Sequence, residues 1–415
     1  MKLNFLPARV RYAILFSVLV FVSVMVYGFF KKEPDIVHIH DHYLPEVPEK
    51  QEVPISQVSF KTEVHPTAKI QAAILLDVSN SMDGLIEQAK AQLWNMVSIM
   101  GQVRCDGMVP AFELGLYEYG RPVNGEDKGY IKQLHAFTIN LDSVSNTLFS
   151  LNTNGGDEYC PQVIVNSADQ LAWDASESTY KVIFIAGNET FRQGPVNWTA
   201  ACQKAKEKNI VVNTIYCGGR QAGIDEYWSL GAECGNGNYT NINHDAIIED
   251  IPTPYDSTLF VLNEQLNATY ISYGSGGAAA ALMQADVDKK NYTMNKSAAA
   301  KRVEVKGKKE LYKNEGWDLV DAVESRNLSV STIDREGLPD SLKKKTTKEL
   351  EQVVAQKSKE RSGIQDKIAD AAKKRNQFLA EERIRRSAQG AEATLESEIE
   401  KIIRSQVKRY NMSVQ

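Results

Sequence analysis

Asp77, Ser79 and Ser81 are the residues whose types and spacing point most clearly to chemistry. They follow a continuous apolar run at 69–78 that has the pattern of a buried strand. An Asp at the end of such a strand, with Ser at +2 and +4, presents one carboxylate and two hydroxyl oxygens toward a common point. These hard oxygen ligands suit Mg²⁺, Mn²⁺ or Ca²⁺. Alternatively, Ser79 or Ser81 caps a helix that starts near Asp83, and this segment alone leaves both interpretations open.

Alternating strands and helices must position these residues. Strand-like runs alternate with helical patterns of about ten residues, which predicts an α/β fold with a doubly wound, mostly parallel, Rossmann-like sheet. Ligands of such sheets bind at the carboxyl ends of the strands. The expected strands are 69–78, 111–119, 129–138, 181–187, 209–218 and 238–242, and the expected helices are 86–100, 142–151, 161–173, 196–208 and 256–272.

Two further turns are expected at the same rim of the sheet. The Gly-rich turn NTNGGDEYC (152–160) contains Asp157, and the turn after the strand at 181–187 begins with Asn188. At this point the chain resembles the von Willebrand factor type A (VWA) domain family, and especially its bacterial membrane-anchored members. DVSNSM stands for the D-x-S-x-S of the metal-ion-dependent adhesion site (MIDAS), Gly-Gly-Asp for the second loop and IFIAGN for the third.

The resemblance covers about residues 69–270 and implies a site for a divalent cation, Mg²⁺ before Mn²⁺ or Ca²⁺, that docks a protein partner and does not catalyse a reaction. The implied ligands are Asp77, Ser79, Ser81, Asp157 and Asn188.

Two positions depart from the family pattern. Asp157 stands where many members have Thr, and Asn188 stands where they have Asp, so the number of carboxylates stays at two. A directly bound Asp157 would neutralise more of the ion's charge and weaken its attraction for a partner carboxylate. Thr153 is an alternative hydroxyl ligand from the same turn.

An uncharged apolar run at 13–30 is long enough to cross most of a bilayer core. Lys2, Arg9 and Arg11 precede it, so the positive-inside tendency predicts a signal anchor with the bulk of the chain extracytoplasmic, in the periplasm or at the cell surface. A cleaved signal peptide is the alternative, with a poor cleavage site at Gly28.

The expected organisation has five parts: an N-terminal transmembrane anchor (1–32), a Pro-rich stalk (33–68), the VWA domain (69–273), a hinge with a small helical region (274–342) and a charged helical tail (343–415). Three alternating histidines of the stalk would share one side of an extended chain, where they either hold zinc or copper or are merely solvated; they are His38, His40 and His42. The tail contains a broken heptad at 350–385, which suggests a coiled coil or self-association, and one amphipathic face at 395–407.

Composition excludes several other functions. Residues 35–300 hold 17 basic and 32 acidic residues, and so acidic a body would repel nucleic acid. The five cysteines show no C-x-x-C spacing, which argues against a thiol oxidoreductase or a structural zinc site, and they leave open buried thiols or one or two disulfides. The histidines inside the domain, His135 and His244, supply no evident general base, which disfavours a metal-dependent hydrolase.

The sequence therefore predicts a membrane-anchored, envelope-facing protein that binds a protein partner through a divalent metal and is not an enzyme. The alternative is a structural stalk or assembly protein that acts through its helical tail and has a degenerate metal site.

Overall fold

A six-stranded sheet forms the centre of the first part of the protein in a computed structural model, which describes residues 68–242, 251–388 and 394–415. The strand order is β4-β3-β1-β5-β6-β7, and only β4 runs antiparallel to its neighbour. Their bounds are β1 Lys69–Asp77, β3 Ala111–Tyr119, β4 Lys132–Thr138, β5 Tyr180–Gly187, β6 Ile210–Cys217 and β7 Asn236–Ile242. The predicted mostly parallel, Rossmann-like sheet is confirmed.

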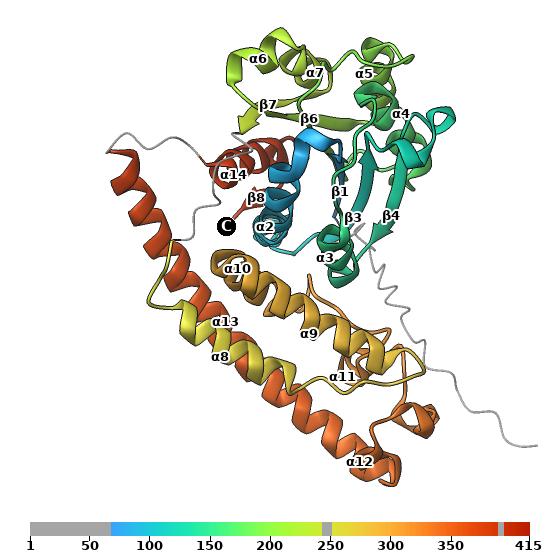
Figure 1. Cartoon of the computed structure of the whole chain (residues 1–415). Helices are drawn as coiled ribbons and strands as arrows, with labels where there is room; N and C mark the ends of the chain where they lie inside the picture. The colour runs from blue at the N-terminus through green and yellow to red at the C-terminus, as the bar shows by residue number, and fades with distance from the viewer. Residues whose placement is uncertain (1–67, 243–250, 389–393) are drawn as a thin grey trace, which may run out of the picture. The chain divides into compact units, whose positions relative to one another are not determined.

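Side chains of β1 alternate between two apolar cores, one on each face of the sheet. Ile70, Ile74 and Leu76 enter the first core, whereas Ala73 and Leu75 enter the second. Helices α2 (Asp83–Met100) and α3 (Leu141–Ser150) contribute to the first core, and α4 (Cys160–Gln170), α5 (Trp198–Glu207) and α7 (Trp228–Cys234) to the second. Both faces are thus covered by helices (Figure 1). Helix α6 (Arg220–Asp225) precedes α7.

The last helix of the chain, α14 (Leu395–Gln406), belongs to the first core. Its buried residues Ile399, Ile402 and Ile403 pack with α2 and the sheet, which confirms the amphipathic face expected there and shows what covers it. The chain then ends in strand β8 (Ser413–Val414), which pairs antiparallel with β2 (Val103–Arg104). Helix α14 and strand β8 are therefore part of the α/β domain, although they lie far from it in the sequence.

A helical region fills residues 251–388, between β7 and α14. Its α-helices are α8 (Asp256–Asn267), α9 (Gly277–Met294), α10 (Lys296–Lys306), α11 (Leu319–Glu324), α12 (Asp340–Lys343) and α13 (Thr347–Ser387). The sequence analysis expects a hinge at the beginning of the region 274–342, but helix α9 begins there at Gly277. The Ala-rich run that follows has high intrinsic helix propensity, and this outweighs the preceding glycines.

Short 3₁₀ helices connect these elements. They are η1 (Asn80–Met82), η2 (Pro122–Asn124), η3 (Glu126–Lys128), η4 (Val330–Thr332), η5 (Arg335–Gly337) and η6 (Val407–Tyr410).

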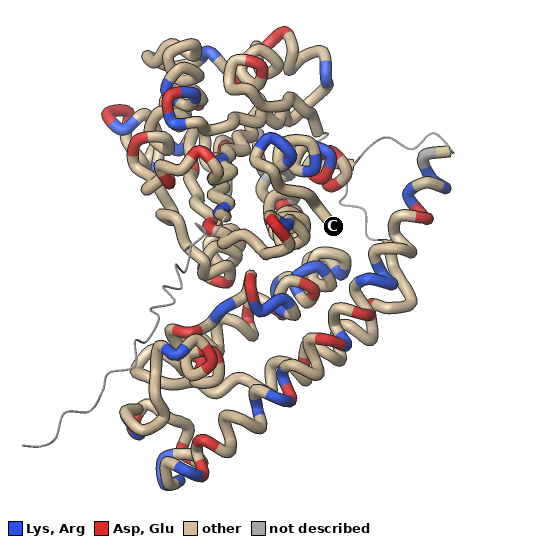
Figure 2. The backbone as a smooth tube through the Cα atoms, turned by 180° about the vertical axis from the view of Figure 1, so that it is seen from behind, with Lys and Arg blue, Asp and Glu red and all other residues tan. Residues whose placement is uncertain are grey.

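The long helix α13 buries the broken heptad of the sequence within its own chain. Leu350, Val354 and Ile368 pack on residues from α8, α10 and α11, while charged residues of both signs are spread along the helix (Figure 2). Arg361, which interrupts the apolar pattern, is itself buried and donates to the Asp318 carboxylate at 2.7 Å. The apolar heptad positions of α13 are therefore buried within this chain. A coiled coil with another chain is not shown and stays a prediction.

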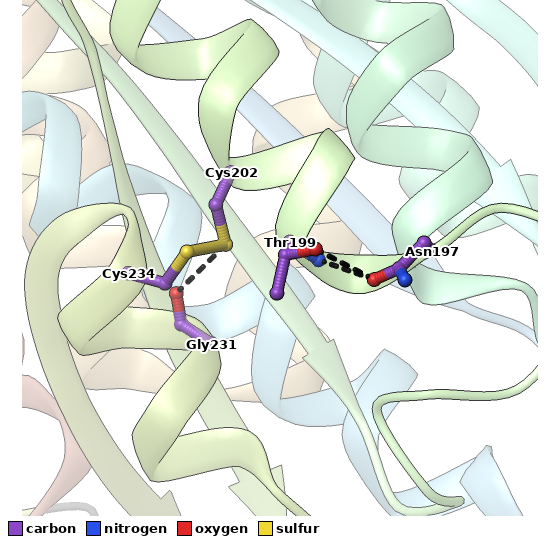
Figure 3. The surroundings of a disulfide bond; sticks show 5 residues. All are labelled: Asn197, Thr199, Cys202, Gly231 and Cys234. Carbon is purple, nitrogen blue, oxygen red and sulfur yellow. Dashed lines mark hydrogen bonds between the residues drawn. A yellow bond between two sulfur atoms is a disulfide. The ribbon is translucent and has the colours of Figure 1, made fainter.

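One disulfide, Cys202–Cys234, joins α5 to α7 beside the second core (Figure 3). Cys160 and Cys217 are buried free thiols, and Cys105 is a half-exposed one. The sequence left open whether the cysteines form disulfides or are buried thiols, and the structure contains both.

Replacing Cys202 and Cys234 together by Ser is expected to lower the free energy of unfolding. The bridge closes a loop with a sequence separation of 32, for which chain entropy gives about 3–4 kcal/mol. Urea unfolding of the full chain measures the change, with Cys105→Ser as the control outside the bridge. An equal change in both variants would contradict a stabilising role for this disulfide.

No helix among the residues that the structure describes is long and apolar enough to span a membrane. The expected anchor at 13–30 and the histidines of the stalk lie outside the described residues, as does His244.

Candidate metal site

The candidate site lies at the carboxyl ends of β1, β3 and β5. Strand β1 lies between β3 and β5. The chain builds the sheet first on the β3 side of β1 and then on the β5 side. Loops that follow the strands therefore diverge here and leave room for a ligand, which is the usual binding position in open α/β sheets. Asp77 is the last residue of β1, where the sequence analysis expects it.

Asp77 is fully buried, and the turn after β1 wraps around its carboxylate. The Ser79 backbone N–H donates to Asp77 Oδ1 at 2.8 Å, and Ser79 is itself buried. Helix α2 begins at Asp83 with Met82 at its N-cap, so neither Ser79 nor Ser81 occupies the capping position considered as the alternative. The turn thus places Ser79 at the carboxylate and not at the helix terminus.

Glu158 is a second buried carboxylate at the same place, and the sequence analysis missed it. Two contacts fix its loop: the Asn154 N–H donates to the Val78 carbonyl at 2.9 Å, and the Glu158 N–H donates to Gln193 Oε1 at 2.9 Å. A Cβ placed on Gly120 would lie 2.9 Å from Asp77 Oδ1 and 3.1 Å from Glu158 Cγ. The two acidic side chains therefore flank the same glycine.

Electrostatics confirm that the two carboxyl groups interact. Burial is the main cause that raises the pKa of Glu158 well above its usual range, and the charge of Asp77 adds to it. Burial likewise raises the pKa of Asp77, although hydrogen bonds from Ser79 oppose the shift. The exposed Glu189 adds a smaller repulsion to both. Without a counter-charge, the pair can lose its last proton only at a high free-energy cost.

A divalent cation fits this arrangement. Asp77 Oδ2 and Glu158 Oε2 are buried and accept no hydrogen bond from a protein donor, so only a proton held by the carboxyl pair offsets their charge, and a cation could take its place. Gly187 adds space, because a Cβ there would lie 3.1 Å from Asp77 Oδ2. Two carboxylates and a serine match the hard oxygen donors that Mg²⁺, Mn²⁺ and Ca²⁺ prefer. Among the described residues no group of three or more His, Cys, Asp or Glu could hold a metal, so a site here needs hydroxyl or water ligands as well.

The other expected ligands have different surroundings. Asp157 is exposed, and its charge acts on Tyr130 and Tyr159. Asn188 directly follows β5 and is half-buried, as is Thr153 in the second loop. Ser81 lies in η1, and its side chain is outside what the structure describes. The structure thus brings Asp77 and Ser79 together with Glu158, one residue beyond the expected Asp157.

The adjacent acidic residues were the available signal for Glu158. Glu158 is buried and Asp157 is exposed, so only one of these two adjacent acidic side chains turns toward the strand ends. The sequence does not specify which one turns inward, because this depends on the long-range bond to Gln193.

The similarity of this chain to known proteins is limited to the fold. No family model matches the chain, and no curated protein matches it. An aerotolerance-related membrane protein from Bacteroides fragilis is 18% identical, with 42% of this chain and 93% of that chain covered and a TM-score of 0.31. BatB from Bacteroides thetaiotaomicron is 16% identical over 42% and 90% of the two chains, with a TM-score of 0.32. The SpRpn10 VWA domain is 13% identical over 42% and 88%, with a TM-score of 0.32.

VWA domains are thus among the solved structures to which this chain is similar, as the motif after β1 predicts. At these identities the similarity concerns the fold and says nothing about ligands or partners.

Proposed function

We propose that this protein mediates a divalent-metal-dependent protein–protein interaction at the carboxyl ends of β1, β3 and β5. The observation that carries the proposal is the pair of buried carboxylate oxygens without partners, Asp77 Oδ2 and Glu158 Oε2. Asp77, Ser79 and Glu158 would hold the ion, and Ser81 and Asn188 are the further candidates from the motif. When bound, the ion supplies a positive charge that orders the surrounding loops and offers a coordination position to a partner.

The protein's own residues would prepare the site in three ways. The turn after β1 holds Asp77 with the Ser79 N–H, Gln193 fixes the loop that carries Glu158, and Gly120 leaves room between the two carboxylates. This arrangement preorganises the ligands, so little conformational entropy would be lost on metal binding. We assign no catalytic role to these residues.

We also propose an extracytoplasmic location with an N-terminal membrane anchor. The apolar run at 13–30 and the Cys202–Cys234 bridge support it, since disulfides persist in oxidising compartments.

Glu158→Gln is expected to weaken Mg²⁺ or Mn²⁺ binding by at least about tenfold, because it removes one of two ligand charges. Isothermal titration calorimetry of the full chain with Mg²⁺, Mn²⁺, Ca²⁺ and Zn²⁺ measures the affinity, and Asp77→Asn should abolish binding. Metal binding to the wild type should also release a proton, because the metal-free pair retains one; the heat should therefore depend on the buffer.

Asp157→Asn is the matched control for the metal titration. If Glu158 is the inward ligand, this neighbouring substitution should change the metal affinity much less. A larger loss in Asp157→Asn than in Glu158→Gln would instead restore Asp157 as the ligand. Absence of saturable binding by the folded wild type would refute the proposed function.

A further inference from the structure

Two tyrosines meet beside the candidate metal site. The ring centroids of Tyr130 and Tyr159 are 5.4 Å apart, and the interplanar angle of 66° places the rings edge to face. Both side chains are half-buried, so each presents part of its surface to solvent. Tyr159 directly follows Glu158, so the same loop carries this ring and the buried carboxylate of the candidate site.

The backbone around the rings is shaped to hold them there. Tyr130 has φ 59°, a left-handed conformation that bulky residues rarely adopt, and its N–H donates to the Gly125 carbonyl at 2.9 Å. The Tyr159 ring lies between Gly129 and Gly194, where an added Cβ would come within 3.4 Å and 2.6 Å of the ring. The contact at Gly129 is an ordinary van der Waals distance, whereas a side chain at position 194 would collide with the ring, so the loop after β5 needs glycine there.

Two exposed carboxylates, Glu126 and Asp157, flank the ring pair. Partial desolvation raises the pKa of Tyr130 and of Tyr159, and the negative charges of both Glu126 and Asp157 raise each further. Both carboxylates are therefore close enough to act on both rings.

No Lys or Arg of the described chain lies over Tyr130 or Tyr159. A tyrosine of a neighbouring loop does have such a contact: the Arg192 guanidinium stacks on the Tyr227 ring, 3.6 Å from its centroid. This pair is an example of the cation–ring contact that Tyr130 and Tyr159 could make.

We propose that Tyr130, Tyr159, Glu126 and Asp157 form the docking surface for an arginine or lysine side chain of the protein partner. This aromatic–acidic patch combines ring faces, which attract cations, with two carboxylates that can accept charged hydrogen bonds. The inference rests on the proposed function and adds that the protein partner presents a basic side chain.

The charge balance of the rim favours the same class of partner. A divalent ion held by Asp77 and Glu158 would have its two charges offset by these two carboxylates. The exposed Glu126 and Asp157 would then keep their charges for the partner, although the loops after β3 and β5 also carry the exposed Lys128 and Arg192. Two carboxylates beside ring faces attract a basic partner group.

A fluorescence anisotropy titration of the full chain with labelled tetra-arginine, at saturating Mg²⁺, tests the proposal. Tyr159→Leu and Asp157→Asn are each expected to weaken peptide binding by about two- to fivefold, the usual effect of losing one exposed cation–π contact or one exposed ion pair, respectively. The Asp157 side chain is exposed, so this variant keeps the test valid if Tyr159→Leu does not fold. The matched controls are Tyr292→Leu on α9 and Asp225→Asn on α6, whose exposed side chains lie outside the patch and should leave the affinity unchanged.

Two results would overturn the inference: equal losses in the patch variants and the controls, or tetra-glutamate binding as tightly as tetra-arginine. Calorimetry with Mg²⁺ separates this test from that of the metal site, because Tyr159→Leu should keep the wild-type metal affinity. If the wild type bound no metal but still bound tetra-arginine through the patch, the metal proposal alone would fail.

Discussion

A chain that lacks residues 394–415 is expected to lose its folded α/β domain. Helix α14 buries Ile399, Ile402 and Ile403 in the first core, and η6 adds Val407. Burying four aliphatic side chains contributes roughly 6–12 kcal/mol, and a typical domain is stable by only about 5–15 kcal/mol. The truncation therefore removes a contribution as large as the whole stability.

Polar contacts make the position of α14 specific. Gln406 is fully buried, where its Oε1 accepts from the Tyr180 hydroxyl at 2.7 Å and its Nε2 donates to Asn213 Oδ1 at 2.7 Å. Beyond the helix, the Gln415 N–H donates to the Gln102 carbonyl at 3.0 Å. Removing the segment leaves these polar groups, as well as the apolar core, without their partners.

Near-UV circular dichroism and limited proteolysis of the truncated chain should show the loss of native packing, and a synthetic peptide of residues 394–415 should restore it in part. A point variant gives a finer test: Ile403→Asp at a fully buried position should unfold the domain, whereas Ile384→Asp at a 72% exposed position on α13 should not. A cooperative thermal transition near the wild-type temperature in the truncated chain would refute this role of α14.

The place of α14 in the first core determines how assembly through the helical tail, the alternative function, can be tested. Deleting residues 343–415 would separate assembly from metal binding only if the tail were an independent module. Because α14 completes the first core, that deletion should also disrupt the candidate metal site at the end of β1. Substitutions on the exposed face of α13, such as Ile384→Asp, are the better test of assembly through the tail.

Local patterns predicted the elements but not their long-range partners. The apolar run of β1 is visible because both faces of the strand are buried, and the amphipathic face of α14 is visible because its period of 3.6 reflects burial on one side. Nothing local says that α14 packs on the sheet, since Gln406 and its partner Tyr180 on β5 are 226 residues apart. The sequence therefore supports a helical tail but does not indicate that it belongs to the domain core.

Buried charge is the second feature that the sequence could not reveal. Arg361 breaks the heptad of α13 and suggests a solvent-facing position, but Asp318 and Thr269 accept its hydrogen bonds in the interior. Charged residues are rarely buried unless paired, and the pairing becomes visible only with the fold. The same limit applies to Glu158, whose inward direction depends on the bond from its N–H to Gln193.

Arg302→Met is expected to destabilise the protein by about 3–5 kcal/mol, because two buried carboxylates lose their bonds to the guanidinium and one of them keeps no other cation. Arg302 lies on α10 and is 1% exposed. Its Nη1 donates to Asp142 Oδ1 on α3 at 2.6 Å, and its Nε donates to Asp288 Oδ1 on α9 at 2.5 Å. The guanidinium also lies over the Trp94 ring of α2, 4.6 Å from its centroid. One side chain thus connects the helical region to the α/β domain.

The two carboxylates differ in their remaining partners, which allows the prediction to be dissected. Asp288 keeps the Lys306 ammonium, which donates to its Oδ2 at 2.8 Å, whereas Asp142 keeps only the hydroxyl of Tyr312, at 2.5 Å. Most of the cost should therefore arise at Asp142. The double variant Arg302→Met/Asp142→Asn should recover a large part of the lost stability, since it removes the uncompensated charge.

Urea unfolding of the full chain measures these differences, and Arg385→Met is the matched control. Arg385 also pairs with a carboxylate, that of Glu382, but its side chain is 69% exposed, so water replaces the lost bond. Its loss should cost less than about 1 kcal/mol. If Arg302→Met cost no more than Arg385→Met, or if Asp142→Asn gave no recovery, the buried charge pair would not be what holds the helical region against α3.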